Sequence, residues 1–200
     1  MLSRVLEPEV MDSPEEARDY DAMDHATVNR VFIGDFLATW DGRNPVLDVG
    51  AGTAQIPIEL ARQSVAAEIT AIDLAEHMLA LGRANVRQAG FADRIRLQRC
   101  DAKDLPFPSV SFAAVISNSI VHHIPEPMAV LAEMARVLRP GCLLFVRDLL
   151  RPADEATRTA LVKLHAAGAN EHQTKMFADS LDVGQRSSSC HPPVILTTLR

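Results

Sequence analysis

The first residues that could do chemistry lie in the stretch Val46 to Thr53. Two glycines, Gly50 and Gly52, follow an apolar run broken only by Asp48, and a helical pattern from Gln55 to Arg62 comes next. Glycine has no Cβ, so the chain can turn sharply there and bring its backbone close to a ligand. The amide N–H groups at the start of the helix can point at that ligand. This order of strand, glycine turn and helix is typical of sites for nucleotide-type cofactors at the end of a parallel strand.

Polar residues end three further strand-like segments. The second segment ends at Asp73, the third is followed by Asp101 and Ala102, and the fourth ends at Asn118. The carboxyl ends of parallel strands meet at one edge of a sheet, so we expect these residues to lie near Gly50. A carboxylate at the end of the second strand can accept both hydroxyls of a ribose, as it does in dinucleotide folds.

These motifs, in this order, resemble the class I S-adenosylmethionine-dependent methyltransferases, within them the small-molecule type related to quinone-biosynthesis methyltransferases. The resemblance implies S-adenosyl-L-methionine as cofactor and methyl transfer to a small organic molecule. It also implies an α/β fold: a Rossmann-like, doubly wound, mostly parallel sheet with helices on both faces. The resemblance covers roughly residues 20 to 150, and the matching residues are Val46 to Thr53, Ile72-Asp73, Asp101-Ala102 with Leu105-Pro106-Phe107, and Val137 to Gly141.

The resemblance gives the matched positions roles in cofactor binding. Gly50 and Gly52 would let the backbone approach the methionine part, and Asp48 would act on its ammonium group directly or through water. Asp73 would accept the ribose hydroxyls. Asp101 would accept the adenine amino group with the Ala102 amide facing the ring, and Asn118 would reach the methionine amino end. The expected cofactor contacts are Tyr20, Asp48, Gly50, Ala51, Gly52, Asp73, Leu74, Asp101, Ala102 and Asn118.

Each of these positions also has a purely structural interpretation. The glycines can be turn residues and nothing more. Asp73 can cap the helix that follows it, and Asp101 can cap a short turn. Asn118 suits the start of a loop.

Other polar residues are candidates for the acceptor side. His122 and His123 follow the fourth strand, and histidine can take a proton near neutral pH; alternatively one is packed and hydrogen-bonded and the other solvated. Tyr20 would cover the cofactor from an N-terminal arm or simply pack. Arg147-Asp148 would face the substrate or form a solvated ion pair.

Helical and strand-like patterns alternate along the chain, which favours an α/β domain. We expect an arm at 1–21, the cofactor-binding domain at 22–180 and an irregular tail at 181–200. Ser13-Pro14-Glu15-Glu16 could open a short helix within the arm. The expected strands are 45–49, 67–73, 95–100, 112–118 and 142–146, and the expected helices are 22–40, 55–62, 75–89, 127–138 and 152–165.

The tail departs from the pattern of the family, which usually closes its sheet with a final helix and two antiparallel strands. Pro192-Pro193 cannot donate ladder hydrogen bonds. We therefore expect an irregular segment from about Leu181 to Pro193, one strand at Val194 to Leu199, and an incomplete antiparallel part.

Composition excludes several classes of protein. The net charge of −6 and the few aromatic residues argue against a nucleic-acid partner. No stretch is long and apolar enough to span a membrane, and the first residues lack the apolar core of a signal peptide. Cys100, Cys142 and Cys190 lie far apart, which favours reduced thiols in the cytoplasm. We expect no metal site.

Two other functions compete with methyl transfer. A nicotinamide-dependent dehydrogenase would carry a third glycine or alanine where this chain has Gln55. A non-catalytic cofactor-binding or vestigial protein would fit the irregular tail. Asn118-Ser119-Ile120-Val121 lacks the asparagine–proline–proline–aromatic loop of methyltransferases that act on nucleobases, so DNA methylation is not expected. The acceptor atom and the oligomeric state stay open.

Overall fold

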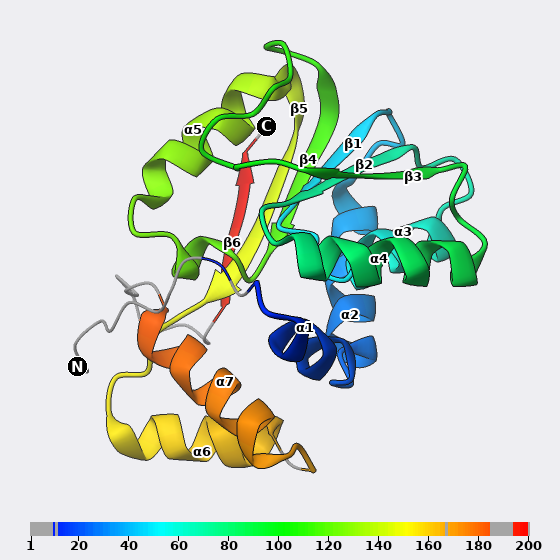
Figure 1. Cartoon of the computed structure of the whole chain (residues 1–200). Coiled ribbons are helices and arrows are strands. Elements are labelled where there is room, and N and C mark those ends of the chain that lie inside the picture. The colour runs from blue at the N-terminus through cyan, green and yellow to red at the C-terminus, as the bar shows by residue number, and fades with distance from the viewer. Residues whose placement is uncertain (1–9, 11, 167, 185–193, 200) are drawn as a thin grey trace.

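The computed structural model describes residues 10, 12–166, 168–184 and 194–199. A six-stranded sheet lies at the centre, with helices packed on both sides (Figure 1). The strands are β1 (Val46–Val49), β2 (Ile69–Asp73), β3 (Ile95–Arg99), β4 (Phe112–Asn118), β5 (Leu138–Leu149) and β6 (Val194–Leu199). The helices are α1 (Pro14–Asp21), α2 (Ala26–Thr39), α3 (Gln55–Gln63), α4 (Glu76–Ala89), the 3-10 helix η1 (Val121–His123), α5 (Pro127–Val137), α6 (Glu155–His165) and α7 (Glu171–Val183).

The sheet has the order β3-β2-β1-β4-β5-β6, in which the first five strands are parallel and β6 is antiparallel. The order reverses between β1 and β4, and ligands of open α/β sheets bind at such a switch point. Val49 is in register with Ile72, and Asp73 with Arg99. The expected doubly wound sheet is confirmed, and the motif-bearing strand ends share one edge.

Alternating side chains of the strands build a core on each face of the sheet. On one face Val46, Ala71 and Phe145 pack with Phe32 and Phe36 of α2 and with residues of α3. On the other face Leu47, Val115 and Leu144 pack with Val130 and Met134 of α5. Both faces are therefore covered, as the near-continuous apolar strands require.

Local signals explain where several helices begin and end. Ser13 and Glu16 form a capping box at the start of α1, in which each side chain accepts the other residue's backbone N–H. Gly90 ends α4 in the left-handed conformation at φ 79°. The short helix in the arm and the end of the helix at 75–89 were both predicted from the sequence.

Three elements differ from the expectations. β5 extends beyond 142–146 in both directions, from Leu138 to Leu149. The helix α7 was not predicted. Its last residues, Leu181 to Val183, are helical where an irregular segment was expected. Residues 185–193 lie outside the described part of the chain. The late strand is confirmed: β6 pairs with β5 in antiparallel register, with Leu149 opposite Val194.

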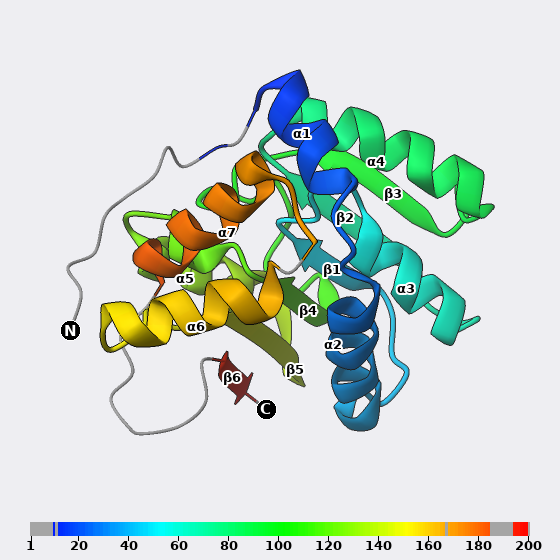
Figure 2. The ribbon, with the colours of Figure 1, turned by 90° about the horizontal axis from the view of Figure 1, so that it is seen from below.

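Helices α6 and α7 pack side by side and lie with α1 near the carboxyl edge of the parallel strands (Figure 2). Contacts join α7 to both α1 and η1. In the described part of the chain, none of the helices combines the length and the apolar character needed to cross a membrane.

Candidate functional site

A cavity of about 770 Å³ opens at the carboxyl ends of the parallel strands. One side, here called the strand-end half, is formed by Gly50, Gly52, Asp73, Leu74, Asp101 and Ala102. The opposite side, here called the helical half, is formed by Leu161, Met176, Phe177, Ser180 and Leu181 of α6 and α7. Asn118, His122 and His123 also line the cavity. Its volume suits one or two small molecules.

The glycine turn after β1 needs its glycines for two reasons. Gly50 has a φ of 81°, which side chains rarely adopt, and a Cβ there would lie 2.1 Å from Cγ2 of Ile120. The N–H groups of Gly50 and Ala51 both donate to the Ile72 carbonyl, at 2.9 and 2.8 Å. Gly52 also has a positive φ, of 52°. The turn is therefore held against β2 and exposes its backbone to the cavity.

Asp73 fastens this turn to the start of α4. Its Oδ2 accepts the Gly52 N–H at 2.7 Å and its Oδ1 accepts the Ala75 N–H at 2.9 Å. Burial raises the pKa of Asp73, and these amide hydrogen bonds oppose that shift. Asp73 closes a turn ahead of α4 and does not cap this helix, because Ala75 is the N-cap residue and no side-chain cap hydrogen bond is present. A carboxylate has about four lone-pair sites, so both oxygens can accept further donors from the cavity.

Asp48 and Ala51 are buried and lie behind the cavity wall. Burial, and then the charge of Asp73, raise the pKa of Asp48 to about 8. Among the described residues no group hydrogen-bonds to its buried Oδ2. An uncompensated buried carboxyl group is costly, so Asp48 is suited to a cationic group in the adjacent cavity.

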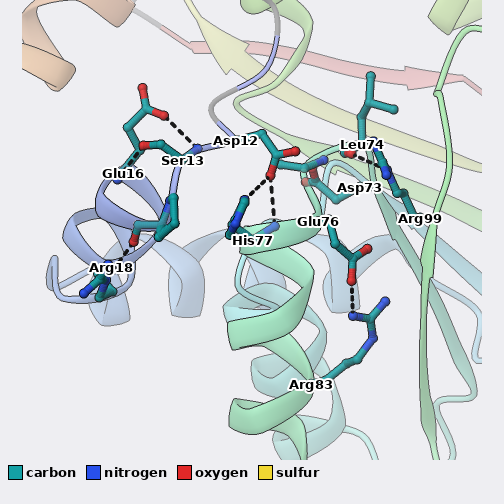
Figure 3. A network of polar contacts seen from close by, with 12 residues as sticks. Asp12, Ser13, Glu16, Arg18, Asp73, Leu74, Glu76, His77, Arg83 and Arg99 are labelled. Atoms are coloured by element: carbon teal, nitrogen blue, oxygen red, sulfur yellow. Dashed lines mark hydrogen bonds and ion pairs between the residues drawn. The ribbon is translucent and has the colours of Figure 1, made fainter.

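The N-terminal arm reaches the site through α1. Asp12 accepts hydrogen bonds from the backbone N–H and Nδ1 of His77, at 2.9 and 3.0 Å, at the start of α4 (Figure 3). Tyr20, at the end of α1, lines the cavity, and its ring lies 4.8 Å from that of His25. A Cβ on Gly52 would be 3.6 Å from Tyr20. Burial raises the pKa of Tyr20 to about 12, so its hydroxyl stays protonated.

The remaining predicted residues of the strand ends also face the cavity. Asp101, Ala102 and Asn118 line it. Asp101 Oδ1 accepts the Lys103 N–H at 2.9 Å, so this carboxylate also caps a short turn. The structure thus brings Tyr20, the glycines, Asp73, Leu74, Asp101, Ala102 and Asn118 around one space.

The buried pair of His122 and Asp148 lies between the two halves. The side chains are 1% and 3% exposed. Nδ1 of His122 contacts Asp148 Oδ1, and the His122 N–H donates to Asp148 Oδ2 at 2.9 Å. His122 is therefore packed and hydrogen-bonded, as one interpretation held. The ring of His123 lies 4.0 Å from that of His122.

The solvated ion pair considered for Arg147 and Asp148 is wrong. Both residues are buried, because they belong to a strand covered on both faces. Neighbouring strand residues point to opposite faces, so the two side chains find different partners. Arg147 Nη2 donates to Asp35 of α2 at 2.5 Å, and its guanidinium lies 5.4 Å from the centre of the Phe32 ring.

The role of α7 was missed in the sequence, although a signal was present. Asn170 and Gln173 form a capping box that begins this helix. Gln173 Nε2 donates to the Asp19 carbonyl at 3.0 Å, and His172 Nδ1 lies 2.5 Å from Asp19 Oδ2. An asparagine three residues before a glutamine, ahead of apolar residues, could have predicted α7. These contacts tie the helical half to the arm.

The charges of the strand-end half have one sign. Asp73 and Asp101 line it, and Asp48 lies behind it. Arg147 is the single lysine or arginine among the described residues that line the cavity, and Asp35 pairs with it. This half is suited to a cationic ligand rather than to a phosphate. No group of three or more potential metal ligands occurs in the part of the chain that the structure describes.

Comparison with known proteins finds a family model that matches the middle of the chain. A family model described as a methyltransferase domain matches residues 46–141, which include β1 to β4 and the strand-end half. This part of the chain is similar to the class I S-adenosylmethionine-dependent methyltransferases.

The chain is similar to proteins of several kinds. A ubiquinone/menaquinone biosynthesis C-methyltransferase of Geobacter sulfurreducens is 35% identical over 103 residues, which are 51% of this chain and 40% of that enzyme. A putative S-adenosylmethionine-dependent methyltransferase of Methanococcus maripaludis has the same fold, with a TM-score of 0.66, 17% identity and coverage of 91% of this chain and 87% of that one. The [4+2]-cyclase SpnF has a TM-score of 0.59 at 26% identity, covering 76% of this chain and 54% of that one. This chain spans less than half the length of the first curated relatives that it matches.

Proposed function

We propose that this chain binds S-adenosyl-L-methionine in the strand-end half and transfers its methyl group to a small organic molecule bound in the helical half. The observation that carries the proposal is the single cavity that joins the glycine turn, Asp73, Asp101 and His122. When bound, the cofactor supplies a methyl carbon already activated by its positively charged sulfur. The protein then has to bind the two reactants, orient the acceptor toward the methyl carbon and exclude water.

The side chains present fit this cofactor. Asp73 would accept the ribose hydroxyls while it keeps its bonds to the turn. Asp101 and the Ala102 amide would hold the adenine, with Leu74 beside it. Gly50, Ala51 and Gly52 would present backbone, and Tyr20 would cover the methionine part. The unpartnered oxygen of Asp48 would act on the ammonium group, with Asn118 near the same end.

The charges separate this proposal from a nicotinamide cofactor. A dinucleotide would bring its pyrophosphate to the glycine turn, beside Asp48 and Asp73. The Asp73 carboxylate at that place would repel an anion and attract a sulfonium or an ammonium group, and a cation beside Asp48 would favour its ionisation. Together with Gln55 in the position of the third glycine, this favours S-adenosylmethionine.

The helical half supports an acceptor with an apolar body. Leu161, Met176, Phe177 and Leu181 line it, and apolar side chains bind apolar surface by excluding water. The Geobacter relative is a quinone-biosynthesis enzyme by name, which agrees with such an acceptor. We further propose that the chain acts in the cytoplasm, an assignment supported by the free, buried thiols of Cys100 and Cys142.

Two measurements test the proposal. Calorimetry with S-adenosylmethionine, S-adenosylhomocysteine and NADH should show binding of the first two and none of the third. A screen of apolar hydroxyl, amine and carbon acceptors with methyl-labelled cofactor should then give a labelled product. Binding without transfer to any acceptor would favour the non-catalytic alternative. Absence of binding would reject both.

A further inference from the structure

We propose that Asp21 is a positioning residue that, through Gln55 and Asn85, holds Tyr20 against the glycine turn as the cover of the cofactor site. This inference rests on the proposed function, in which Tyr20 covers the methionine part of the cofactor. It adds the contacts that fix this cover. It also gives a role to the glutamine that stands where dinucleotide folds carry a third glycine or alanine.

One oxygen of Asp21 joins the end of α1 to the two helices beside the glycine turn. Asp21 Oδ1 accepts a hydrogen bond from Gln55 Nε2 at 3.0 Å and another from Asn85 Nδ2 at 2.8 Å. Gln55 is the first residue of α3, and Asn85 lies in α4. A carboxylate oxygen has two lone pairs, so a single oxygen can accept both hydrogen bonds. These two amide groups therefore fix where α1 ends relative to the turn.

Asn85 continues the connection to the glycine turn itself. The same Nδ2 donates to the Thr53 carbonyl at 3.1 Å, which is possible because an amide NH₂ group has two hydrogens. Helix α4 comes close enough because Gly82, one turn before Asn85, has no side chain: a Cβ there would lie 3.3 Å from the Gly52 carbonyl oxygen. One amide group thus ties the end of α1 to the turn.

Tyr20 directly precedes Asp21, so these contacts also fix the tyrosine. A Cβ on Gly52 would lie 3.6 Å from Cε1 of Tyr20, and Tyr20 lines the cavity. Burial, and then the charges of Asp73, Asp48 and Asp21, raise the pKa of Tyr20 to about 12. The ring therefore lies over the glycine turn, close to the carboxylates of the strand-end half.

The rest of α1 is attached to the protein by other contacts. An apolar cluster around Ala17 packs this helix against the start of α4, and Asp19 contacts α7. Loss of the Asp21 contacts should therefore leave α1 in place and release the end that carries Tyr20.

The first measurement uses the fact that the sequence contains one tyrosine, so ¹³C-labelled tyrosine gives NMR signals from Tyr20 alone. In the full chain without ligand, its ring signals should differ from those of free tyrosine, because the His25 ring lies 4.8 Å away. Asp21→Ala should move the signals toward the free values. Asp21→Asn should keep them, because its amide oxygen can still accept both hydrogen bonds. Signals in Asp21→Ala that match those of the unmodified protein would reject the positioning role.

Calorimetry with S-adenosylhomocysteine measures whether this cover matters for the cofactor. Asp21→Ala should weaken binding by about five- to twenty-fold, and Asp21→Asn by less than about three-fold. An equal loss in both variants would mean that binding depends on the charge of Asp21 and not on its hydrogen bonds, which contradicts the proposal. Glu15→Ala is the matched control, because it removes an exposed carboxylate from the same helix; it should match the unmodified protein in both measurements.

The remaining outcomes separate this inference from the proposed function. If the unmodified chain binds neither S-adenosylmethionine nor S-adenosylhomocysteine, the proposed function is rejected, and the cover with it. If the unmodified chain and Asp21→Ala bind equally well, the inference alone is rejected, even where the melting temperature falls. Should Asp21→Ala not fold, Gln55→Ala decides by the same two measurements, because it removes one hydrogen bond of Asp21 and keeps the other; no change in either measurement rejects the proposal.

Discussion

The strand-end half and the helical half of the cavity are assembled in different ways. In the strand-end half each residue belongs to a short motif at the end of a strand: Gly50, Gly52, Asp73 and Asp101 lie at strand ends that the parallel register brings together. In the helical half the contacts join distant parts of the chain. His122 meets Asp148 across 26 residues, and Gln173 meets Asp19 across 154. Short motifs therefore describe the first half, and only packing describes the second.

The two halves of the cavity also differ in charge. The strand-end half has carboxylates around exposed backbone, and the helical half has apolar side chains with one buried His–Asp pair beside them. One half is suited to a polar, cationic cofactor and the other to an apolar acceptor. If this division is real, substitutions in one half should leave the ligand of the other half bound normally.

The largest expected effect separates catalysis from cofactor binding. If His122 is the base, His122→Gln should lower turnover by about 10²–10⁴-fold, while S-adenosylmethionine affinity measured by calorimetry is retained. His123→Gln should cost less than about ten-fold, because Asp148 holds His122 in place. Near-normal turnover in both variants would mean that neither histidine is the base.

The second test is a substitution in the strand-end half. Each charge-assisted hydrogen bond is worth about 1.5–3 kcal/mol, so Asp73→Ala should weaken S-adenosylmethionine binding by roughly ten-fold or more. The variant also loses the acceptors of the Gly52 and Ala75 N–H groups, so the melting temperature without ligand should fall by several degrees. Asp93→Ala removes an exposed carboxylate and serves as the control. An unchanged affinity of Asp73→Ala for S-adenosylmethionine would reject the assignment of Asp73 to the ribose hydroxyls.

A smaller effect is expected from the helical half. Phe177→Ala should raise the KM of the acceptor by about five- to ten-fold, because part of an apolar side chain no longer covers it. The affinity for S-adenosylmethionine should stay the same. Leu164→Ala, on the neighbouring helix, removes a side chain that is 69% exposed and does not line the cavity, so it should change neither quantity. An equal loss of cofactor affinity in Phe177→Ala would contradict the division of the cavity.

The smallest effect concerns stability. The native chain keeps Asp48 protonated up to about pH 8, whereas the unfolded chain ionises it above about pH 4. The native state therefore binds more protons between these values, and stability should fall as pH rises through this window. Asp48→Asn removes this dependence and should raise the melting temperature of the ligand-free protein by a few degrees at pH 7.5, while it weakens cofactor binding. A thermal scan across pH 5 to 8 that shows the same slope in both proteins would reject the shift.

Much of the architecture was predictable from the sequence, because its signals are local. The apolar runs before Gly50 and Asn118, the glycine after α4 and the proline that begins α5 each act through neighbouring residues, so the alternation of strands and helices follows from them. The same holds for the glycine turn, where Gly50 takes a positive φ that other residues rarely adopt. Even Val194 to Leu199 carried its own strand signal, and it pairs with β5.

Tertiary structure alone decided which polar side chain pairs with which. Nothing near Arg147 and Asp148 in the sequence indicates that one side chain turns to Asp35 and the other to His122. That choice depends on the face of β5 to which each side chain points and on what packs there. Likewise, the capping box at Asn170 could have announced α7, but not its contact with Asp19. Local chemistry determines elements and turns; long-range burial determines the acceptor side of the cavity.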